Sequence, residues 1–189
     1  MFPTITDYNQ VIQRNGSYAF STLNALTFIP SRTVPVRIFS YGSGSFAVIF
    51  KAKDYYNTFA IRCFLSADQE KFYRYKEIDN YFRNINASWL TKISFLEKEI
   101  NVNGRYYPVL KMDWINGKLL NNYIGEVLYN DQLLTALQQE IVAISESLES
   151  NQIGHGDIQC GNLCKEVSTL PSICCLLVVI LLISVILNL

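Results

Sequence analysis

Hydrophobic and polar positions between Val34 and Leu65 follow the short period of β-strands. Three runs rich in apolar and aromatic residues are separated by two polar connections, Gly42–Ser45 and Asp54–Asn57. Hairpin-like connections between such runs predict an antiparallel meander. The expected strands are Val36–Tyr41, Phe46–Lys53 and Thr58–Leu65.

Residues 68–85 change to a helical period. Aromatic and aliphatic residues recur there every three or four positions, with basic residues between them: Phe72, Tyr75, Ile78, Phe82 and Ile85. This spacing predicts an amphipathic helix over Asp68–Ile85. Two further strands, Ile93–Val102 and Arg105–Met112, flank Asn103-Gly104, which is a strong signal for a two-residue hairpin turn.

Two helices are predicted after a break at Gly117. The first is short and covers Leu119–Val127. The second, Asp131–Ser150, carries one apolar stripe, and Asp131 is placed to cap its start. The stripe consists of Leu133, Leu134, Leu137, Ile141, Ile144 and Leu148.

Both ends of the chain depart from these patterns. Residues 1–35 show no sustained period, with short helical stretches indicated at Thr6–Gln13 and Ser21–Ala25, and we assign no chemistry to them. Ile173–Leu189 is almost entirely apolar. It is short for a membrane span, which typically takes about 20 residues.

Composition and charge narrow the class of protein. Half of the residues are hydrophobic, which argues for a folded chain. Lys+Arg and Asp+Glu balance at 16 each, so we expect no nucleic acid partner. The five cysteines are odd in number and no leader-like segment precedes them, so we expect reduced thiols in a cytoplasmic protein.

Two features of the strand region suggest phosphate chemistry. Gly42 and Gly44 let the backbone turn tightly and approach phosphate oxygens, although an ordinary hairpin turn has the same pattern. Arg62, in the third strand, is either a cation for those phosphates or a solvated residue on an amphipathic strand.

Two acidic features could complete such a site. Glu77, in the helix after Arg62, is placed to pair with it, although a surface pair of Glu77 with a neighbouring lysine is an alternative, and Glu70 is a competing candidate. Near the end of the chain, Asp157 is a candidate base for an acceptor hydroxyl, and the amide oxygen of Asn162 suits a hard cation.

Together these features resemble the first part of a protein-kinase-like domain of bacterial type. The resemblance covers Met1–Leu163 and is carried by the glycine pair, Ala60-Ile61-Arg62, Glu77, Val109–Gly117 and the His155-Gly156-Asp157 loop. It implies an α+β fold with a five-stranded antiparallel N-lobe sheet, one N-lobe helix and a helical C-lobe. ATP and Mg²⁺ are the implied cofactors.

The resemblance assigns roles residue by residue. Asp157 matches the base, Arg62 the strand lysine, Glu77 its helix partner and Asn162 a magnesium ligand. Backbone groups at the end of the last predicted strand would read the adenine edge. The implied nucleotide-binding residues are Gly42, Gly44, Phe46, Ala60, Arg62, Met112, Asp113 and Trp114.

Several residues depart from the family pattern. Ala47 replaces a third glycine, Arg62 replaces lysine and Gly156 replaces arginine. The family continues after the loop with a short hairpin and a second metal-binding Asp, and no Asp follows Asp157 here. We therefore expect a truncated domain with an incomplete C-lobe and a hydrophobic C-terminal helix.

The expected parts of the chain are an N-terminal extension (1–33), an N-lobe (34–113), a partial C-lobe with the catalytic loop (114–167) and a hydrophobic tail (168–189). Three interpretations of Ile173–Leu189 compete: the scrambled end of a disrupted gene, which we favour, a membrane anchor, or a buried helix packed on Leu137 and Ile144.

The expected ancestral activity is ATP-dependent phosphoryl transfer to a protein Ser/Thr hydroxyl, weak or lost here because a magnesium ligand is missing. The alternatives are a membrane-anchored pseudokinase-type binding module and an HGD-type kinase of small molecules. The expected partners are ATP and a protein or small-molecule hydroxyl acceptor, with membrane contact through Ile173–Leu189 if the tail is an anchor. The expected location is cytoplasmic or, with that anchor, the membrane.

Overall fold

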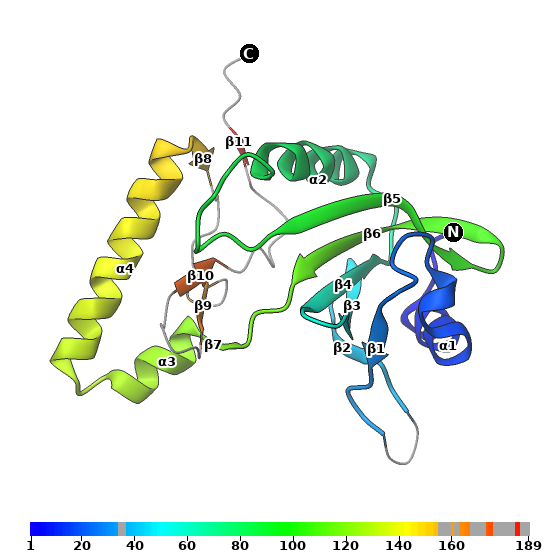
Figure 1. The fold of residues 1–189 in the computed structure, drawn as a ribbon, viewed down its shortest axis with the longest axis horizontal. Helices are drawn as coiled ribbons and strands as arrows, with labels where there is room; N and C mark the ends of the chain where they lie inside the picture. The colour runs from blue at the N-terminus through cyan, green and yellow to red at the C-terminus, as the bar shows by residue number, and fades with distance from the viewer. Residues whose placement is uncertain (34–36, 155–159, 161–162, 167–172, 176–183, 186–189) are drawn as a thin grey trace. The chain divides into compact units, whose positions relative to one another are not determined.

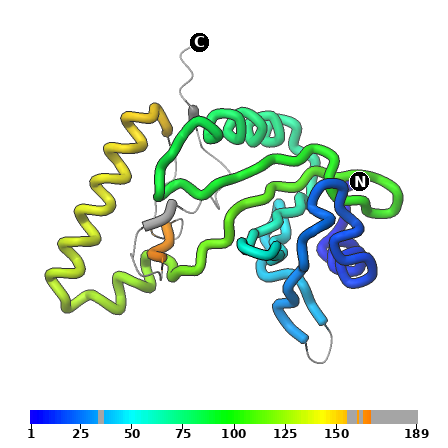
Figure 2. The backbone as a smooth tube through the Cα atoms, in the orientation of Figure 1, coloured from blue at the N-terminus to red at the C-terminus, as the bar shows by residue number. Residues whose placement is uncertain are grey.

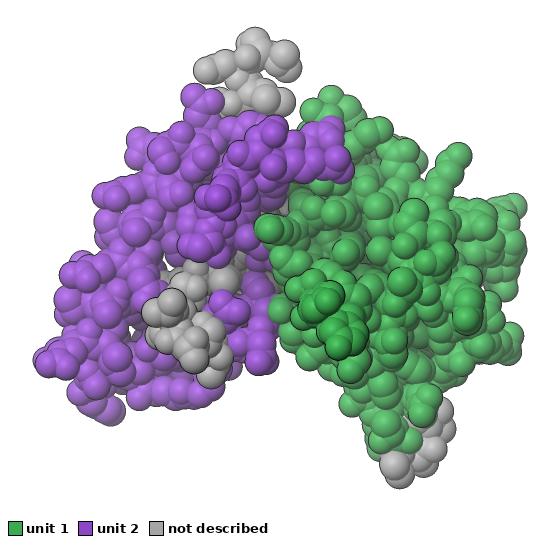
Figure 3. Space-filling view, viewed as in Figure 1, with its two compact units in different colours: residues 1–79, 92–114 green, residues 80–91, 115–189 purple. Residues whose placement is uncertain are grey.

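The computed structural model describes residues 1–33, 37–154, 160, 163–166, 173–175 and 184–185. The chain divides into two compact units, coloured separately in Figure 3. Unit 1 comprises Met1–Asp79 and Lys92–Trp114, and unit 2 comprises Asn80–Thr91 and Ile115–Leu189.

A six-stranded antiparallel sheet forms the centre of unit 1 (Figure 1). The strands pair in the order β1-β3-β4-β6-β5, and β2 also pairs with β3. Their bounds are β1 (Thr27–Ile29), β2 (Ser40–Ser43), β3 (Ala47–Lys53), β4 (Thr58–Phe64), β5 (Ile93–Val102) and β6 (Arg105–Asp113). The expected number of five strands was wrong because β1 adds to the edge of β3, with Phe28 opposite Ala52. Three residues are too few for an alternating pattern to be recognised in the sequence.

The predicted hairpin between β5 and β6 is confirmed. Asn103 and Gly104 both have positive φ, 52° and 80°, as the common two-residue hairpin turn requires. Figure 2 traces the two strands side by side. Their register shifts between Leu96 and Ile100, which marks a β-bulge on this hairpin.

The first part of the chain covers one face of the sheet. α1 (Ile5–Asn15) begins with a capping box in which Thr4 and Asp7 bond each other, and a 3₁₀ turn follows at Gly16–Ala19. The predicted early helix is thus confirmed, whereas residues 21–25 are not helical. The core cluster joins this segment to the strands through Tyr8, Ile12, Phe20, Phe28, Val48, Phe50, Ile61, Cys63 and Val109.

α2 (Gln69–Phe82) contacts the sheet through aromatic rings. The ring centroid of Phe64 on β4 lies 5.0 Å from that of Phe72 and 5.6 Å from that of Tyr75. Phe95 on β5 lies 5.8 Å and 5.9 Å from the same two rings. Aromatic pairs at such distances each contribute about 0.5–1.5 kcal/mol beyond the burial of their area. The predicted amphipathic helix is therefore confirmed.

Unit 2 contains both predicted helices of the second half of the chain. They are α3 (Leu120–Val127) and α4 (Asp131–Ser150). The expected cap of α4 was wrong by one residue, because Asn130 rather than Asp131 accepts the 3.1 Å hydrogen bond from the N–H of Leu133. The strands of unit 2 are β7 (Gly117–Leu119), β8 (Ile153–Gly154), β9 (Leu163–Glu166), β10 (Ile173–Cys175) and β11 (Ser184–Val185).

The apolar stripe of α4 is only partly buried. Leu137, Ile144 and Leu148 are buried, whereas Leu133 is 42% exposed. Next to the stripe, Glu140 holds the buried ammonium of Lys165 on β9, at 2.5 Å and 2.6 Å from its two carboxylate oxygens. A buried cation is costly unless it is paired in this way.

The expected hydrophobic C-terminal helix was wrong for the described residues of the tail. Ile173–Cys175 forms β10, antiparallel to β9, and Ser184–Val185 forms β11, antiparallel to β8. The tail is rich in Val and Ile, whose branched side chains favour strands. None of the helices formed by the described residues combines the length and the hydrophobicity of a membrane-spanning segment.

Candidate nucleotide site

Ala60, Arg62 and Met112, three of the candidate nucleotide residues of unit 1, share the face of the sheet opposite the core. On β3, Phe50 and its alternate neighbours belong to the core cluster. Because side chains alternate along a strand, Ile49 and Lys51 point to the other face. The same argument on β4 places Ala60 and Arg62 on that face.

Strand register aligns the predicted phosphate residues in one row. Gly42 of β2 lies opposite Ile49, and Ile49 lies opposite Arg62. Strands are about 4.8 Å apart, so the Cα atoms of Gly42 and Arg62 are roughly 10 Å apart. In a neighbouring row of the same face, Ala60 lies opposite Met112 of β6. The fold therefore brings together Gly42, the cation Arg62 and two predicted pocket residues.

Gly42 and Gly44 have no local structural need to be glycine. Both are exposed, and a Cβ added at either would meet no atom within 4 Å. Neither has a φ in the left-handed region, in contrast to Gly16 and Gly104. The N–H of Gly44 donates a 3.0 Å hydrogen bond to the carbonyl oxygen of Ala47, which closes the turn. What these glycines do provide is close access of a ligand to the backbone.

Arg62 is buried, with 4% of its surface exposed. Its guanidinium carbon lies 5.9 Å from the ring centroid of Phe64. Burial lowers the pKa of Arg62, and the interaction with Tyr75 opposes that change. A planar guanidinium presents a fork of donors that matches phosphate oxygens, so the position suits anion binding.

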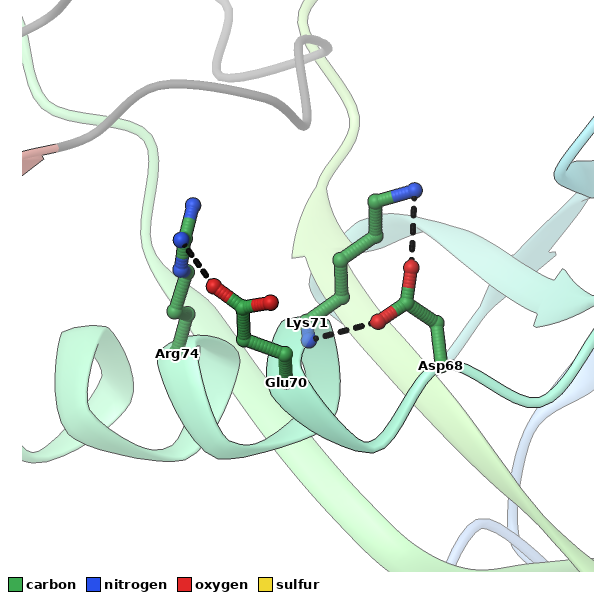
Figure 4. Close-up of polar contacts among 4 residues, drawn as sticks. All are labelled: Asp68, Glu70, Lys71 and Arg74. Carbon is green, nitrogen blue, oxygen red and sulfur yellow. Dashed lines mark hydrogen bonds and ion pairs between the residues drawn. The ribbon is translucent and has the colours of Figure 1, made fainter.

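Glu77 is half-buried on α2, and the ion pairs between described residues do not include one that joins it to Arg62. The pKa of Lys76 is raised mainly by its hydrogen bond to Glu97, and the carboxylate of Glu77 adds a smaller effect. The competing candidate, Glu70, pairs with Arg74 one turn further along α2 (Figure 4). Neither acidic candidate therefore contacts the buried guanidinium through a described ion pair.

Asp79 is a buried carboxylate of α2 that sequence reasoning missed. It is 4% exposed and accepts a 2.9 Å hydrogen bond from the N–H of Phe95, which ties α2 to β5. Its position carried a signal, because Asp79 falls on the apolar stripe that contains Tyr75 and Phe82. A polar residue at such a position needs a partner inside the protein.

The end of β6 carries the residues expected to read adenine. Met112 is buried and Asp113 is exposed. The N–H of Asp113 donates to the carbonyl oxygen of Lys92 at 3.1 Å, and the N–H of Trp114 donates to that of Thr58 at 2.9 Å. Because both N–H groups are used within unit 1, an adenine edge here would have to meet carbonyl oxygens or the backbone after Trp114.

Two lysines next to predicted residues were missed by sequence reasoning. The Nζ of Lys51 lies 4.1 Å from the ring centroid of Trp114, a cation–π contact. The Nζ of Lys71 on α2 lies 4.0 Å from the ring centroid of Phe46, which is 44% exposed at the tip of the β2–β3 hairpin. No spacing in the sequence marks these contacts, because each joins elements that are separate along the chain.

The predicted catalytic loop cannot be placed. His155, Asp157 and Asn162 lie outside the described residues, between β8 and β9. Among the residues that are described, no group of three or more His, Cys, Asp and Glu side chains could hold a metal ion. The roles of Asp157 as a base and Asn162 as a magnesium ligand therefore stay predictions.

A cavity of about 470 Å³ in unit 1 lies apart from these residues. Its lining includes Phe2, residues of α2 such as Phe72, and residues of the β5–β6 hairpin such as Tyr107. None of the predicted nucleotide residues lines it. It therefore does not serve as the candidate site.

Comparison with known proteins identifies the fold. No family model and no curated protein matches the chain. A mutant of the kinase domain of Mycobacterium tuberculosis PknI is similar, with a TM-score of 0.57 and 13% identity over 82% of this chain and 59% of that domain. The unmutated domain gives a TM-score of 0.56 and 12% identity over 80% of this chain and 58% of that domain. The chain therefore has a protein-kinase-like fold and spans about three fifths of the PknI domain's length.

Proposed function

We propose that unit 1 binds ATP at the β2–β3 glycine hairpin and that the chain derives from a phosphotransferase acting on hydroxyl groups. The observation that carries the proposal is the pair Gly42 and Gly44, which neither crowding nor backbone conformation explains. Gly42 lies in register with the buried cation Arg62, and Gly44 follows in the turn of the same hairpin, on a fold similar to kinase domains. Backbone access beside a guanidinium suits a polyphosphate.

The other predicted residues have roles that fit this arrangement. Ala60 and Met112 are buried and lie opposite each other, so they offer an apolar surface for a purine ring. Asp157 would accept the proton of the attacking hydroxyl, and Asn162 would hold Mg²⁺, which supplies charge neutralisation for phosphoryl transfer. The acceptor is a protein Ser/Thr hydroxyl in this proposal, with a small-molecule hydroxyl as the alternative.

The sequence after the predicted catalytic loop favours a binding module with little turnover over an efficient enzyme. Kinases place a second metal-binding Asp after that loop, and residues 158–189 contain no Asp. We therefore propose weak phosphoryl transfer at most, with pseudokinase-type nucleotide binding as the second candidate.

A double substitution of the glycines tests nucleotide binding. We expect Gly42→Ala with Gly44→Ala to leave the melting temperature without ligand nearly unchanged, because the added Cβ atoms meet no neighbour within 4 Å. The same methyl groups should keep phosphates from the backbone and weaken MgATP about tenfold or more. At a ligand concentration of 100 times the wild-type Kd, the stabilisation by MgATP would then fall from about 2.7 to about 1.4 kcal/mol. Thermal unfolding with and without MgATP measures both effects.

The matched control is Gly125→Ala on α3, where an added Cβ also meets nothing within 4 Å. This variant should keep the full stabilisation by MgATP. An unchanged MgATP affinity in the double glycine variant would show that the hairpin does not hold the phosphates, and the proposed site would be wrong.

A second substitution separates enzyme from binding module. We expect wild type to transfer phosphate slowly to a generic protein acceptor and Asp157→Asn to remove that activity while keeping MgATP binding, because only the proton acceptor is lost. Transfer of radiolabelled phosphate from ATP measures the activity, and thermal unfolding with and without MgATP measures the binding. Rapid turnover by wild type would contradict the proposal of weak catalysis, and turnover that persists in Asp157→Asn would contradict the role of Asp157.

A further inference from the structure

Lys71 brings a cation to the tip of the glycine hairpin. Its Nζ lies 4.0 Å from the ring centroid of Phe46 and 3.0 Å from Oδ2 of Asp68. The Lys71 side chain is 18% exposed. Figure 4 shows it extending from the first turn of α2, with its ammonium directed to Asp68. A charged group is thus held against the loop that contains Gly44.

Asp68 fixes the position of this ammonium. Its Oδ1 accepts a 3.0 Å hydrogen bond from the backbone N–H of Lys71, as a helix cap does, while Oδ2 contacts the ammonium of the same residue. The hydrogen bond from the backbone N–H of Lys71 lowers the pKa of Asp68 most, and the bond from the Lys71 side chain lowers it further. Asp68 therefore stays ionised near neutral pH and keeps Lys71 oriented.

The other cations of α2 are engaged differently. Arg74 pairs with Glu70 on the same helix (Figure 4), and Lys76 pairs with Glu97 at 2.7 Å. Their side chains are 50% and 57% exposed, respectively. Lys71 is the α2 cation that rests on the glycine hairpin.

We propose that Lys71 binds the terminal phosphate of the nucleotide and leaves the Phe46 ring as it does so. The inference rests on the nucleotide binding proposed above. An ammonium has three N–H donors, so Lys71 can keep its contact with Asp68 and exchange its weaker contact with the Phe46 ring for a bond to an anionic phosphate oxygen. The buried Arg62 and the hairpin-tip Lys71 then contact different phosphate groups of the same nucleotide.

This assignment predicts a dependence on the number of phosphates. A residue at the hairpin tip meets the phosphate furthest from the purine ring, whereas AMP ends before that point. Lys71 should therefore contribute to the affinity for MgATP and hardly at all to the affinity for AMP. A residue that only positioned the hairpin would affect both ligands alike.

Calorimetric titration of the full chain with MgATP and with AMP tests the inference. We expect Lys71→Met to weaken MgATP about tenfold, the effect of losing one charge-assisted hydrogen bond, and AMP less than about twofold. Arg74→Met is the matched control, since it removes a cation from the same helix and should change both affinities less than about twofold. Lys71→Arg keeps the charge and should retain MgATP affinity within about threefold.

Four outcomes would overturn the inference. If wild type binds no MgATP, the proposed function and this inference fall together. If wild type binds MgATP and Lys71→Met binds it equally well, only the role of Lys71 is wrong. If Lys71→Met lost equal affinity for MgATP and for AMP, Lys71 would be a positioning residue. If Arg74→Met lost as much MgATP affinity as Lys71→Met, the effect would come from the net charge of α2 and not from a contact of Lys71.

Discussion

We expect Tyr8→Ala to lower the free energy of unfolding of unit 1 by about 3–5 kcal/mol, the usual cost of removing a buried aromatic side chain. Tyr8 is fully buried, and its hydroxyl donates a 2.8 Å hydrogen bond to the carbonyl oxygen of Phe64 on β4. Burial raises the pKa of Tyr8, so the hydroxyl stays protonated and keeps this bond at any physiological pH. The substitution would leave a cavity in the core between α1 and the sheet.

Urea unfolding followed by circular dichroism measures this loss, and hydrogen exchange of the β3 and β4 amides assigns it to unit 1. Tyr8→Phe is the matched control, because it removes only the hydroxyl and should cost about 1 kcal/mol. If Tyr8→Ala unfolded at the same urea concentration as wild type, the first residues of the chain would be a dispensable extension and our description of the core would be wrong.

We expect Glu99→Ala to lower the free energy of unfolding by a similar amount, about 3–5 kcal/mol. Glu99 is 1% exposed, and its carboxylate accepts hydrogen bonds of 2.8 Å from the N–H groups of Thr22 and Leu23. The hydroxyl of Thr22 adds a third bond at 2.9 Å. Removing the carboxylate leaves two N–H groups without their acceptor inside the protein, which costs more than the bonds themselves contribute.

The same unfolding measurement tests this prediction. Glu97→Ala is the control on the same strand, because Glu97 is exposed and its ion pair with Lys76 is a surface contact. That variant should unfold much like wild type. Equal effects of the two substitutions would mean that the carboxylate of Glu99 does not anchor the first part of the chain to β5.

Both predictions concern the face of the sheet opposite the candidate site, and this is where the sequence was least informative. The first 33 residues have no sustained period and were expected to form an extension. They form a helix, a 3₁₀ turn and a strand that cover the core face. Short elements leave no periodic signal, and their burial comes from contacts with residues far along the chain.

The longer elements were predictable because each repeats its pattern enough times. The hairpin of β5 and β6, helix α2 and helix α4 were found nearly at their true bounds. Glu99 shows the limit of that reasoning. The alternating pattern of the strand predicts that Glu99 is a surface residue. The register shift between Leu96 and Ile100 instead lets Glu99 and its neighbour Ile100 both be buried.

The candidate site divides in the same way. Gly42, Gly44 and Arg62 were identified from residue type and order, and the strand register places Gly42 and Arg62 in one row. The contact of Lys71 with Phe46 could not be found from the sequence, because it depends on where α2 approaches the hairpin. The expected pairing of Arg62 with Glu77 is a distance between two elements, which spacing along the chain does not specify.

The sequence by itself determined the type and order of the long elements, because hydrophobic periodicity and turn residues act locally. It also determined the kinase-like resemblance, because that rests on residue types in a particular order. Only the tertiary structure decided that the first 33 residues belong to the sheet, that Glu99 and Asp79 are buried carboxylates, and that Lys71 meets the glycine hairpin. These facts depend on contacts between distant parts of the chain, where burial and charge balance are set by packing rather than by neighbouring residues.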